Sequence, residues 1–391
     1  MRRMIEMVAP ALAVLGLFVS NLYSAPLPDK KPKVEVVFCL DTTGSMGGLL
    51  DGAKAKIWSI CNQIAGAKPT PELKVGLVAY RDKGDDYVTK VTDLTTDLDG
   101  IHAELKKFTP GGGGDTPEHV NQALNDAVNK IKWSDDKKTL KIIFLVGDAP
   151  AHMDYADDVK YPVSCKKAVE KNIIINTIQC GSDGETTKQW KDIAAKSEGS
   201  YAAIPQSGGV VAIATPHDKR LAEINEALTR TVVMRGLAGE RKAAEKKLEA
   251  AAELAKPSAP GGAAPPAAVA AAADRAGFAA KSGKAGGGGT RDLLEEAVKD
   301  GKVDAAKLKE VKEEELADEI KKLKTEKERV EYLQKKADER AKLTKEALEL
   351  DKKRAAFIAE ELKKKGKDKD SFDSSVLEML KKQSKKYELD F

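Results

Sequence analysis

Three polar segments of the sequence carry oxygen-bearing side chains in a pattern that suits a hard metal ion. The first is DTTGSM, in which Asp41, Thr43 and Ser45 alternate with other residues directly after an apolar run. Alternate residues of a tight turn can direct one carboxylate and two hydroxyls at one point, and Mg²⁺ prefers oxygen ligands in octahedral geometry. Because Asp, Thr and Ser are also ordinary turn and cap residues, this segment alone leaves a plain turn open.

The other two segments add Thr116 and Asp148. Thr116 follows four consecutive glycines in GGGGDTPEH, and glycine lets a backbone approach a bound group closely. The alternative for this segment is a helix start in which Asp115 and Glu118 form a capping box, although that leaves the glycines unexplained. Asp148 follows the apolar run IIFLVG. The candidate metal ligands are therefore Asp41, Thr43, Ser45, Thr116 and Asp148.

Strand-like and helix-like segments alternate from residue 33 to about residue 234, and these elements must position the candidate ligands. Apolar runs such as KVEVVFCL, TLKIIFLVGD and NIIINTIQC are separated by helix-like stretches. Buried β-branched runs between helices indicate a doubly wound, mostly parallel α/β sheet with helices on both faces, a Rossmann-like architecture. Ligands of such sheets bind outside the carboxyl ends of the strands, which is where the three polar segments are expected.

In this order and context, the polar segments make residues 33–234 resemble a von Willebrand factor type A domain with a metal-ion-dependent adhesion site. The resemblance implies coordination of Mg²⁺, or of another divalent cation such as Mn²⁺ or Ca²⁺. By the same resemblance, the ligands would be the hydroxyls of Thr43, Ser45 and Thr116, with Asp41 and Asp148 acting largely through water. A free coordination position would then bind an Asp or Glu carboxylate of a partner protein. The implied function is a protein-binding module for adhesion or assembly.

Two departures from the family pattern bear on this site. The chain has Thr43 where serine is commoner, which keeps a hydroxyl and adds a methyl group. Asp115, next to Thr116, would add a carboxylate close to the metal, raising cation affinity while weakening the attraction for an incoming acid.

A metal-dependent hydrolase or phosphatase-like enzyme is the first alternative function. Phosphoryl transfer from an aspartate would need a second carboxylate two residues on, but position 43 is threonine. The sequence also has no G-x-S-x-G elbow after a strand and no phosphate-binding loop of the G-x-x-x-x-G-K type. We therefore predict no catalytic residues, no organic cofactor and no enzyme. His152 with Asp148 and Asp154 could form a zinc cluster, although a loop histidine bonded to nearby backbone is the simpler interpretation.

Residues 1–25 carry two arginines, a short apolar stretch and then small and polar residues. This pattern is typical of a secretory signal peptide, and an uncleaved version would tether the protein to a membrane. The protein is thus expected to be bacterial and exported, and to be periplasmic, secreted or membrane-anchored facing outward. Its cysteines are widely spaced and lie in apolar runs or helix-like stretches, so we expect free thiols.

The charge of the chain argues against nucleic acid as a partner. Lys and Arg number 66 against 62 Asp and Glu, for a net charge of +4. Nucleic-acid-binding domains carry a clear excess of basic residues, so this balance gives no argument for nucleic acid as a partner. The protein partner is what the resemblance implies.

The C-terminal part of the chain changes composition twice. A helical extension is predicted at 235–254, and the Ala/Pro/Gly-rich segment 255–290 is predicted to be a flexible linker. Residues 291–391 are rich in Lys, Glu, Leu and Ala and predict a charged, all-helical, weakly coiled-coil-like tail. Polar residues interrupt its heptad seam, so its helices would pair weakly, fold back on one another or self-associate. A structural protein that acts through this tail is the second alternative function.

Overall fold

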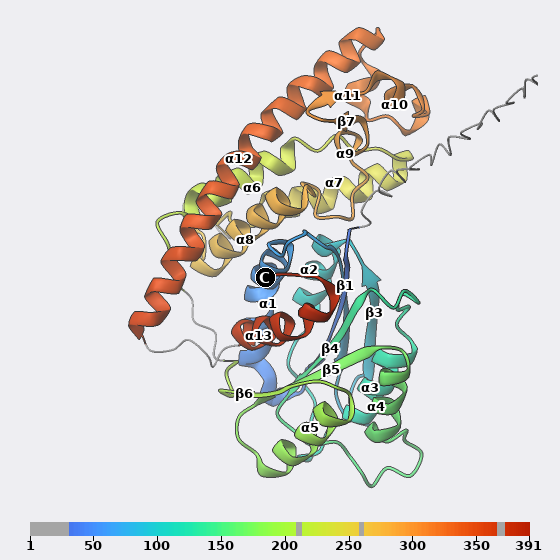
Figure 1. The fold of residues 1–391 in the computed structure, drawn as a ribbon, viewed down its shortest axis with the longest axis vertical. Helices are drawn as coiled ribbons and strands as arrows, with labels where there is room; N and C mark the ends of the chain where they lie inside the picture. Colours follow the sequence, from blue (N-terminus) through green and yellow to red (C-terminus); the bar gives the residue numbers. More distant parts are fainter. Residues whose placement is uncertain (1–30, 209–212, 258–261, 366–371) are drawn as a thin grey trace, which may run out of the picture. The chain divides into compact units, whose positions relative to one another are not determined.

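A six-stranded sheet in the order β3-β2-β1-β4-β5-β6 forms the centre of the computed structural model (Figure 1). The strands are β1 (Lys33–Asp41), β2 (Glu72–Tyr80), β3 (Thr89–Thr95), β4 (Leu140–Gly147), β5 (Ile173–Cys180) and β6 (Tyr201–Ile204). Only the β2–β3 pair is antiparallel, so the predicted doubly wound, mostly parallel sheet is confirmed. The structure describes residues 31–208, 213–257, 262–365 and 372–391. The predicted signal or anchor at 1–25 lies outside these residues.

The strand order has its switch point at β1: β2 and β3 lie on one side of it, and β4, β5 and β6 lie on the other. The register pairs Asp41 with Tyr80 on one side and Leu40 with Val146 on the other. The residues that follow β1, β2 and β4 therefore emerge at the same edge, which is the edge where such sheets bind ligands.

Helices cover both faces of the sheet (Figure 1). On one face, Phe38 and Leu40 pack with α1 (Gly47–Ala65) and α2 (Leu98–Lys107), and a short 3₁₀ turn (Gly44–Met46) leads from β1 into α1. On the other face, Val37 and Cys39 pack with helices of the second core. These helices are α3 (Val120–Asn129), α4 (Tyr161–Glu170) and α5 (Gly184–Lys196). All four cysteines are free and buried, which confirms the expected thiols.

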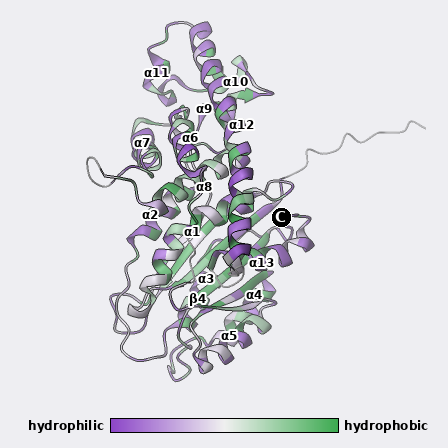
Figure 2. Ribbon diagram, turned by 90° about the vertical axis from the view of Figure 1, so that its left-hand side faces the viewer, coloured by the Kyte–Doolittle hydropathy of each residue, from purple (hydrophilic) through white to green (hydrophobic). Residues whose placement is uncertain are grey.

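The residues after the sheet form a largely helical region. Its main helices are α6 (Asp218–Arg230), α7 (Ala238–Ala252), α8 (Pro266–Ser282) and α12 (Glu326–Lys365). Between α8 and α12 lie the short elements α9 (Leu293–Ala297), β7 (Val298–Lys299), β8 (Lys302–Val303), α10 (Ala305–Lys309), the 3₁₀ turn Glu313–Glu315 and α11 (Asp318–Lys321). Among the described residues of the tail, the short strands β7 and β8 interrupt the predicted all-helical pattern. In Figure 2 the strands are mostly hydrophobic in colour and α12 is mostly hydrophilic. Across the described residues, no helix has the length and apolar character that a membrane span requires.

The Ala/Pro/Gly-rich segment is a packed helix over much of its length, which corrects the flexible linker predicted at 255–290. In α8, Ala272, Ala273 and Ala276 have no solvent exposure, and the helix packs on α1 and α6. Arg275, also buried, donates from Nε and Nη2 to the Asp99 carboxylate at 2.8 and 2.7 Å. Alanine is the strongest helix former, and its small side chain allows close helix packing. A low-complexity composition therefore concealed a core helix.

The last helix, α13 (Phe372–Ser384), returns to the central sheet. The Phe372 ring lies 6.0 Å from that of Phe38 in β1. The side-chain amides of Gln383 and Asn176 exchange hydrogen bonds of 3.0 and 2.7 Å. The long helix α12 packs against α6 and α8 of the same chain. The tail therefore folds back, as one of its predicted arrangements had it, and self-association remains a prediction.

Removing the Phe372 ring should destabilise the whole fold. The side chain is 1% exposed in the main core, so Phe372→Ala is expected to lower the free energy of unfolding by about 3 to 5 kcal/mol. Leu348→Ala on α12 is the control, because this side chain is 40% exposed and should change stability by no more than about 0.5 kcal/mol. Urea unfolding of the full chain measures both. Equal effects of the two substitutions would show that α13 is not part of the core.

Candidate metal centre

Asp41 is the buried acid at the centre of the site. It ends β1 with no solvent exposure. Its Oδ1 accepts hydrogen bonds from the Thr43 amide at 2.9 Å and from the Thr43 hydroxyl at 2.7 Å, whereas Oδ2 has no hydrogen-bond partner. Burial, with a smaller contribution from the charge of Asp148, raises the pKa of Asp41 to about 7. A buried carboxylate with one unpartnered oxygen is suited to binding a cation.

The neighbouring hydroxyls and Asp148 lie in the loops that follow β1 and β4. The Thr43 and Ser45 hydroxyl oxygens are 3.5 Å apart, with Thr43 buried and Ser45 exposed. Asp148 is half-buried and accepts a hydrogen bond of 2.6 Å from the Gln206 side chain. Gly147 lies so close to Asp41 that an added Cβ would be 2.9 Å from the Asp41 Oδ2 atom. Glycine at this position thus lets the loop that carries Asp148 approach Asp41.

The glycine-rich loop contacts the Asp41 loop through its backbone. The amides of Gly44 and Gly111 donate across the two loops, to the Gly112 and Thr42 carbonyls at 3.3 and 3.1 Å. Gly113 has a φ of +83°, which favours glycine, and an added Cβ there would lie 3.6 Å from Thr43. The loop therefore brings residues 113–118 next to the first loop of the site.

Within that loop, Glu118 is the buried acid and Thr116 is exposed. The same Cβ added to Gly113 would lie 3.3 Å from Glu118 Oε1, while Glu118 Oε2 has no hydrogen-bond partner. Burial, followed by the charges of Asp41 and other nearby acids, raises the pKa of Glu118 to about 9. The structure thus brings a second unpartnered acid toward Asp41. The predicted role of Thr116 stays a prediction.

The capping box considered for this segment is not formed. Helix α3 begins at Val120, and the residue before it, His119, makes no side-chain cap bond. Sequence reasoning assigned Glu118 to that cap and so missed it as a site residue. The sequence DTPE could have indicated Glu118 as a site residue, because this carboxylate follows the four glycines closely, three residues after Asp115.

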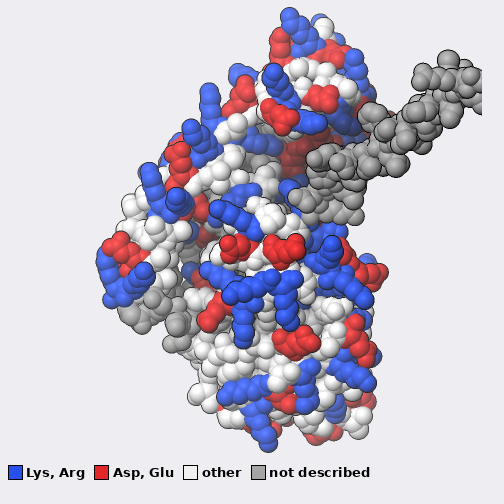
Figure 3. Space-filling view, viewed as in Figure 1, with Lys and Arg blue, Asp and Glu red and all other residues white. Residues whose placement is uncertain are grey.

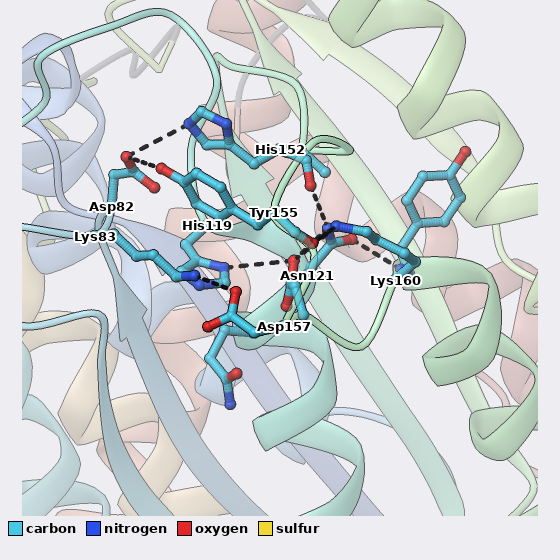
Figure 4. A network of polar contacts seen from close by, with 12 residues as sticks. Asp82, Lys83, His119, Asn121, His152, Tyr155, Asp157 and Lys160 are labelled. Atoms are coloured by element: carbon cyan, nitrogen blue, oxygen red, sulfur yellow. Dashed lines mark hydrogen bonds and ion pairs between the residues drawn. The ribbon is translucent and has the colours of Figure 1, made fainter.

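A second polar cluster lies in the neighbouring loops (Figure 4). It joins His152, after β4, with Asp82, directly after β2, and with Asp115 of the glycine-rich loop. The zinc cluster considered from the sequence paired His152 with Asp148 and Asp154. Asp154 does contact the imidazole, as considered. The other acids near the ring are Asp82 and Asp115, and not Asp148. Asp82 was missed, although it follows the apolar run KVGLVAY closely.

Part of the chain matches a known family of domains. Residues 35–217 match the family model described as von Willebrand factor A domain. The chain contains a von Willebrand factor A domain. Domains of this family are generally interaction modules rather than enzymes.

The similar proteins match only part of this chain. Mouse von Willebrand factor A domain-containing protein 7 is 35% identical over 102 residues, which are 26% of this chain and 11% of the mouse protein. The rat protein of that name is 33% identical over 118 residues, or 30% of this chain and 13% of its own length. The chain thus spans about an eighth of the length of these relatives.

Among solved structures, the SpRpn10 VWA domain is 17% identical, with a TM-score of 0.35, and the match covers 44% of this chain and 88% of that one. Proximal thread matrix protein 1 from the mussel byssus is 15% identical, with a TM-score of 0.33 and coverage of 45% and 42%.

Burial of Asp41 should make the metal-free protein less stable as the pH rises. The pKa of Asp41 is raised to about 7 in the folded chain, against about 3.9 for an unfolded aspartate, so the folded state holds the proton more tightly. This stabilising contribution is complete below about pH 4 and is lost as the pH rises to about 7.

The nearly isosteric change Asp41→Asn should remove this dependence. Thermal unfolding in EDTA from pH 4 to pH 8 is the measurement, and the melting temperature of the variant should fall less than that of the wild type. Asp135→Asn, at an exposed position, is the control. Parallel profiles for wild type and Asp41→Asn would contradict the expected effect of burial.

Proposed function

We propose that this protein is an exported, metal-dependent protein-binding module. A divalent cation, Mg²⁺ or another such as Mn²⁺ or Ca²⁺, would bind at Asp41 and allow the site to bind a carboxylate of a partner protein. The observation that carries the proposal is the buried Asp41 Oδ2 atom, which has no hydrogen-bond partner. The other oxygen of this carboxylate accepts a hydrogen bond from the Thr43 hydroxyl, which lies 3.5 Å from the Ser45 hydroxyl. Export rests on the pattern of residues 1–25.

The residues that fit a cation all offer oxygen. Asp41, Thr43, Ser45 and Asp148 supply two carboxylates and two hydroxyls, a set that suits Mg²⁺. The remaining protein ligand would come from the glycine-rich loop. Glu118 fits this role better than Thr116 because its side chain is buried, its Oε2 atom has no hydrogen-bond partner and its Oε1 atom lies close to Gly113. When bound, the cation would supply positive charge that attracts a partner's carboxylate.

These residues also explain how the site would stay open to a partner. Asp41 and Thr43 are buried beneath the loop, whereas Ser45 is exposed. The buried residues would hold the cation from below, and the exposed side would admit an incoming acid. The two Thr43 hydrogen bonds fix the Asp41 carboxylate, so little rearrangement would be needed on binding.

Mg²⁺ calorimetry on the full chain tests which loop residue matters. We expect Asp41→Ala to abolish binding. We expect Glu118→Gln, which replaces the proposed loop ligand by a neutral amide, to weaken binding by at least about tenfold. Thr116→Ala, at an exposed position, should change affinity less than about threefold if it makes no contact with the cation. The opposite ranking would return the role to Thr116. Absence of binding by the wild type would overturn the proposal.

A peptide library tests the carboxylate partner. Peptides selected on the full chain in Mg²⁺ should contain Asp or Glu, and changing that residue to Asn or Gln should abolish binding. EDTA should release the peptides, and the Asp41→Ala variant should not bind them. Peptides that bind equally well without a carboxylate, or in EDTA, would contradict this mode of recognition.

A further inference from the structure

His152, Asp82 and Asp115 converge from three loops at the sheet edge. The His152 Nε2 atom lies 3.4 Å from Asp82 Oδ2 and 3.8 Å from Asp115 Oδ2. One ligand atom from each residue lies within 4.8 Å of the other two. Figure 4 shows the Asp82 carboxylate directed toward the His152 ring, with the Tyr155 ring alongside. The site proposed above uses none of these three residues.

The cluster holds buried polar atoms that lack partners. His152 is 3% exposed, and its Nε2 atom has no hydrogen-bond partner. Asp82 is 6% exposed, and its Oδ1 atom also has none. Buried polar atoms in folded proteins are nearly always satisfied, so these two atoms call for a ligand.

The hydrogen bond at the other ring nitrogen, Nδ1, determines which nitrogen of His152 carries the proton. Its Nδ1 atom lies 2.8 Å from the Asp154 carboxylate, which can only accept a hydrogen bond when ionised. With the proton on Nδ1, the Nε2 lone pair points at two carboxylates and would be repelled unless a metal cation or a second ring proton lies between them. A carboxylate on the far nitrogen is also the usual support of a metal-bound histidine.

The spacing of the ligand atoms fits a tetrahedral transition metal. Zn²⁺ binds imidazole nitrogen and carboxylate oxygen at about 2.0 to 2.1 Å, so neighbouring ligand atoms of a tetrahedron lie about 3.3 Å apart. The distances of 3.4 and 3.8 Å are close to this value. One neutral imidazole and two carboxylates also balance the charge of a divalent ion.

We propose that His152, Asp82 and Asp115 form a second metal site, for Zn²⁺ or a similar transition-metal dication, with three protein ligands and one open position. Imidazole among the ligands favours such a metal over Mg²⁺. The Asp115 side chain is 64% exposed, so the open position faces solvent.

A supporting shell holds the buried ligands in place. Tyr155 stacks on the His152 ring with centroids 4.0 Å apart and donates from its hydroxyl to Asp82 Oδ2 at 2.7 Å. Lys83 Nζ lies 4.2 Å above the Tyr155 ring and forms an ion pair with Asp157 at 2.6 Å. Since Tyr155 contacts both His152 and Asp82, it fixes their relative position.

Competition between the full chain and a chromogenic zinc chelator measures the affinity of the site for Zn²⁺. The wild type should bind Zn²⁺, and His152→Gln should weaken binding at least about tenfold, as expected when a metal site loses a ligand. His217→Gln is the matched control, because this half-exposed histidine begins α6 outside the cluster. Asp41→Ala should retain Zn²⁺ binding, which separates this site from the proposed Mg²⁺ site.

A second variant guards against misfolding. Asp115→Asn changes an exposed side chain and should also weaken Zn²⁺ binding without altering the melting temperature. Co²⁺ bound to the wild type should give the intense visible absorption of tetrahedral coordination, and this should disappear in His152→Gln.

Three results would overturn the proposal. They are a wild type that does not bind Zn²⁺, equal affinity in His152→Gln and His217→Gln, and a weak octahedral Co²⁺ spectrum. The first result, together with an imidazole protonated on both nitrogens by NMR, would show that His152 is an ion-paired cation.

Discussion

Burial of carboxylates without matching positive charge is the constraint on which the sheet edge depends. Asp41 is fully buried and Glu118 nearly so, and each keeps an oxygen without a hydrogen-bond partner. Their pKa values are raised mainly because burial disfavours the charged form. If both acids are ionised, a bound cation is needed to balance their charge; without one, a proton must neutralise at least one of them. The loops that bring these acids together are therefore organised for binding rather than for stability of the metal-free chain.

The rest of the fold holds this unfavourable arrangement in place. β1 is paired on both sides by parallel strands, and its side chains pack into the hydrophobic cores of both faces. On one face the core is completed by α8 and α13, which come from the C-terminal half of the chain. Figure 3 shows Lys and Arg intermixed with Asp and Glu over the face in view.

Two neighbouring sites with different chemistry would share the same loops. The Asp41 site offers only oxygen and suits a hard cation, whereas the cluster at His152 adds an imidazole. Asp115 and Glu118 belong to one loop but face different sites. A metal held by Asp115 would restrain the glycine-rich loop and so the position of Glu118, which would couple the two sites physically.

The sequence by itself determined the parallel sheet and the place of Asp41, Thr43, Ser45 and Asp148 relative to it. Apolar periodicity and strand ends are local properties of the chain, so they can be read without the fold. Tertiary structure alone decided that Glu118 and Asp82 face the sheet edge, because their burial depends on loops that meet only after folding. It also decided the packing of α8 and α13. Alanine-rich and charged segments look unstructured or solvent-exposed until a surface from elsewhere in the chain covers them, and that surface is not encoded in their own pattern.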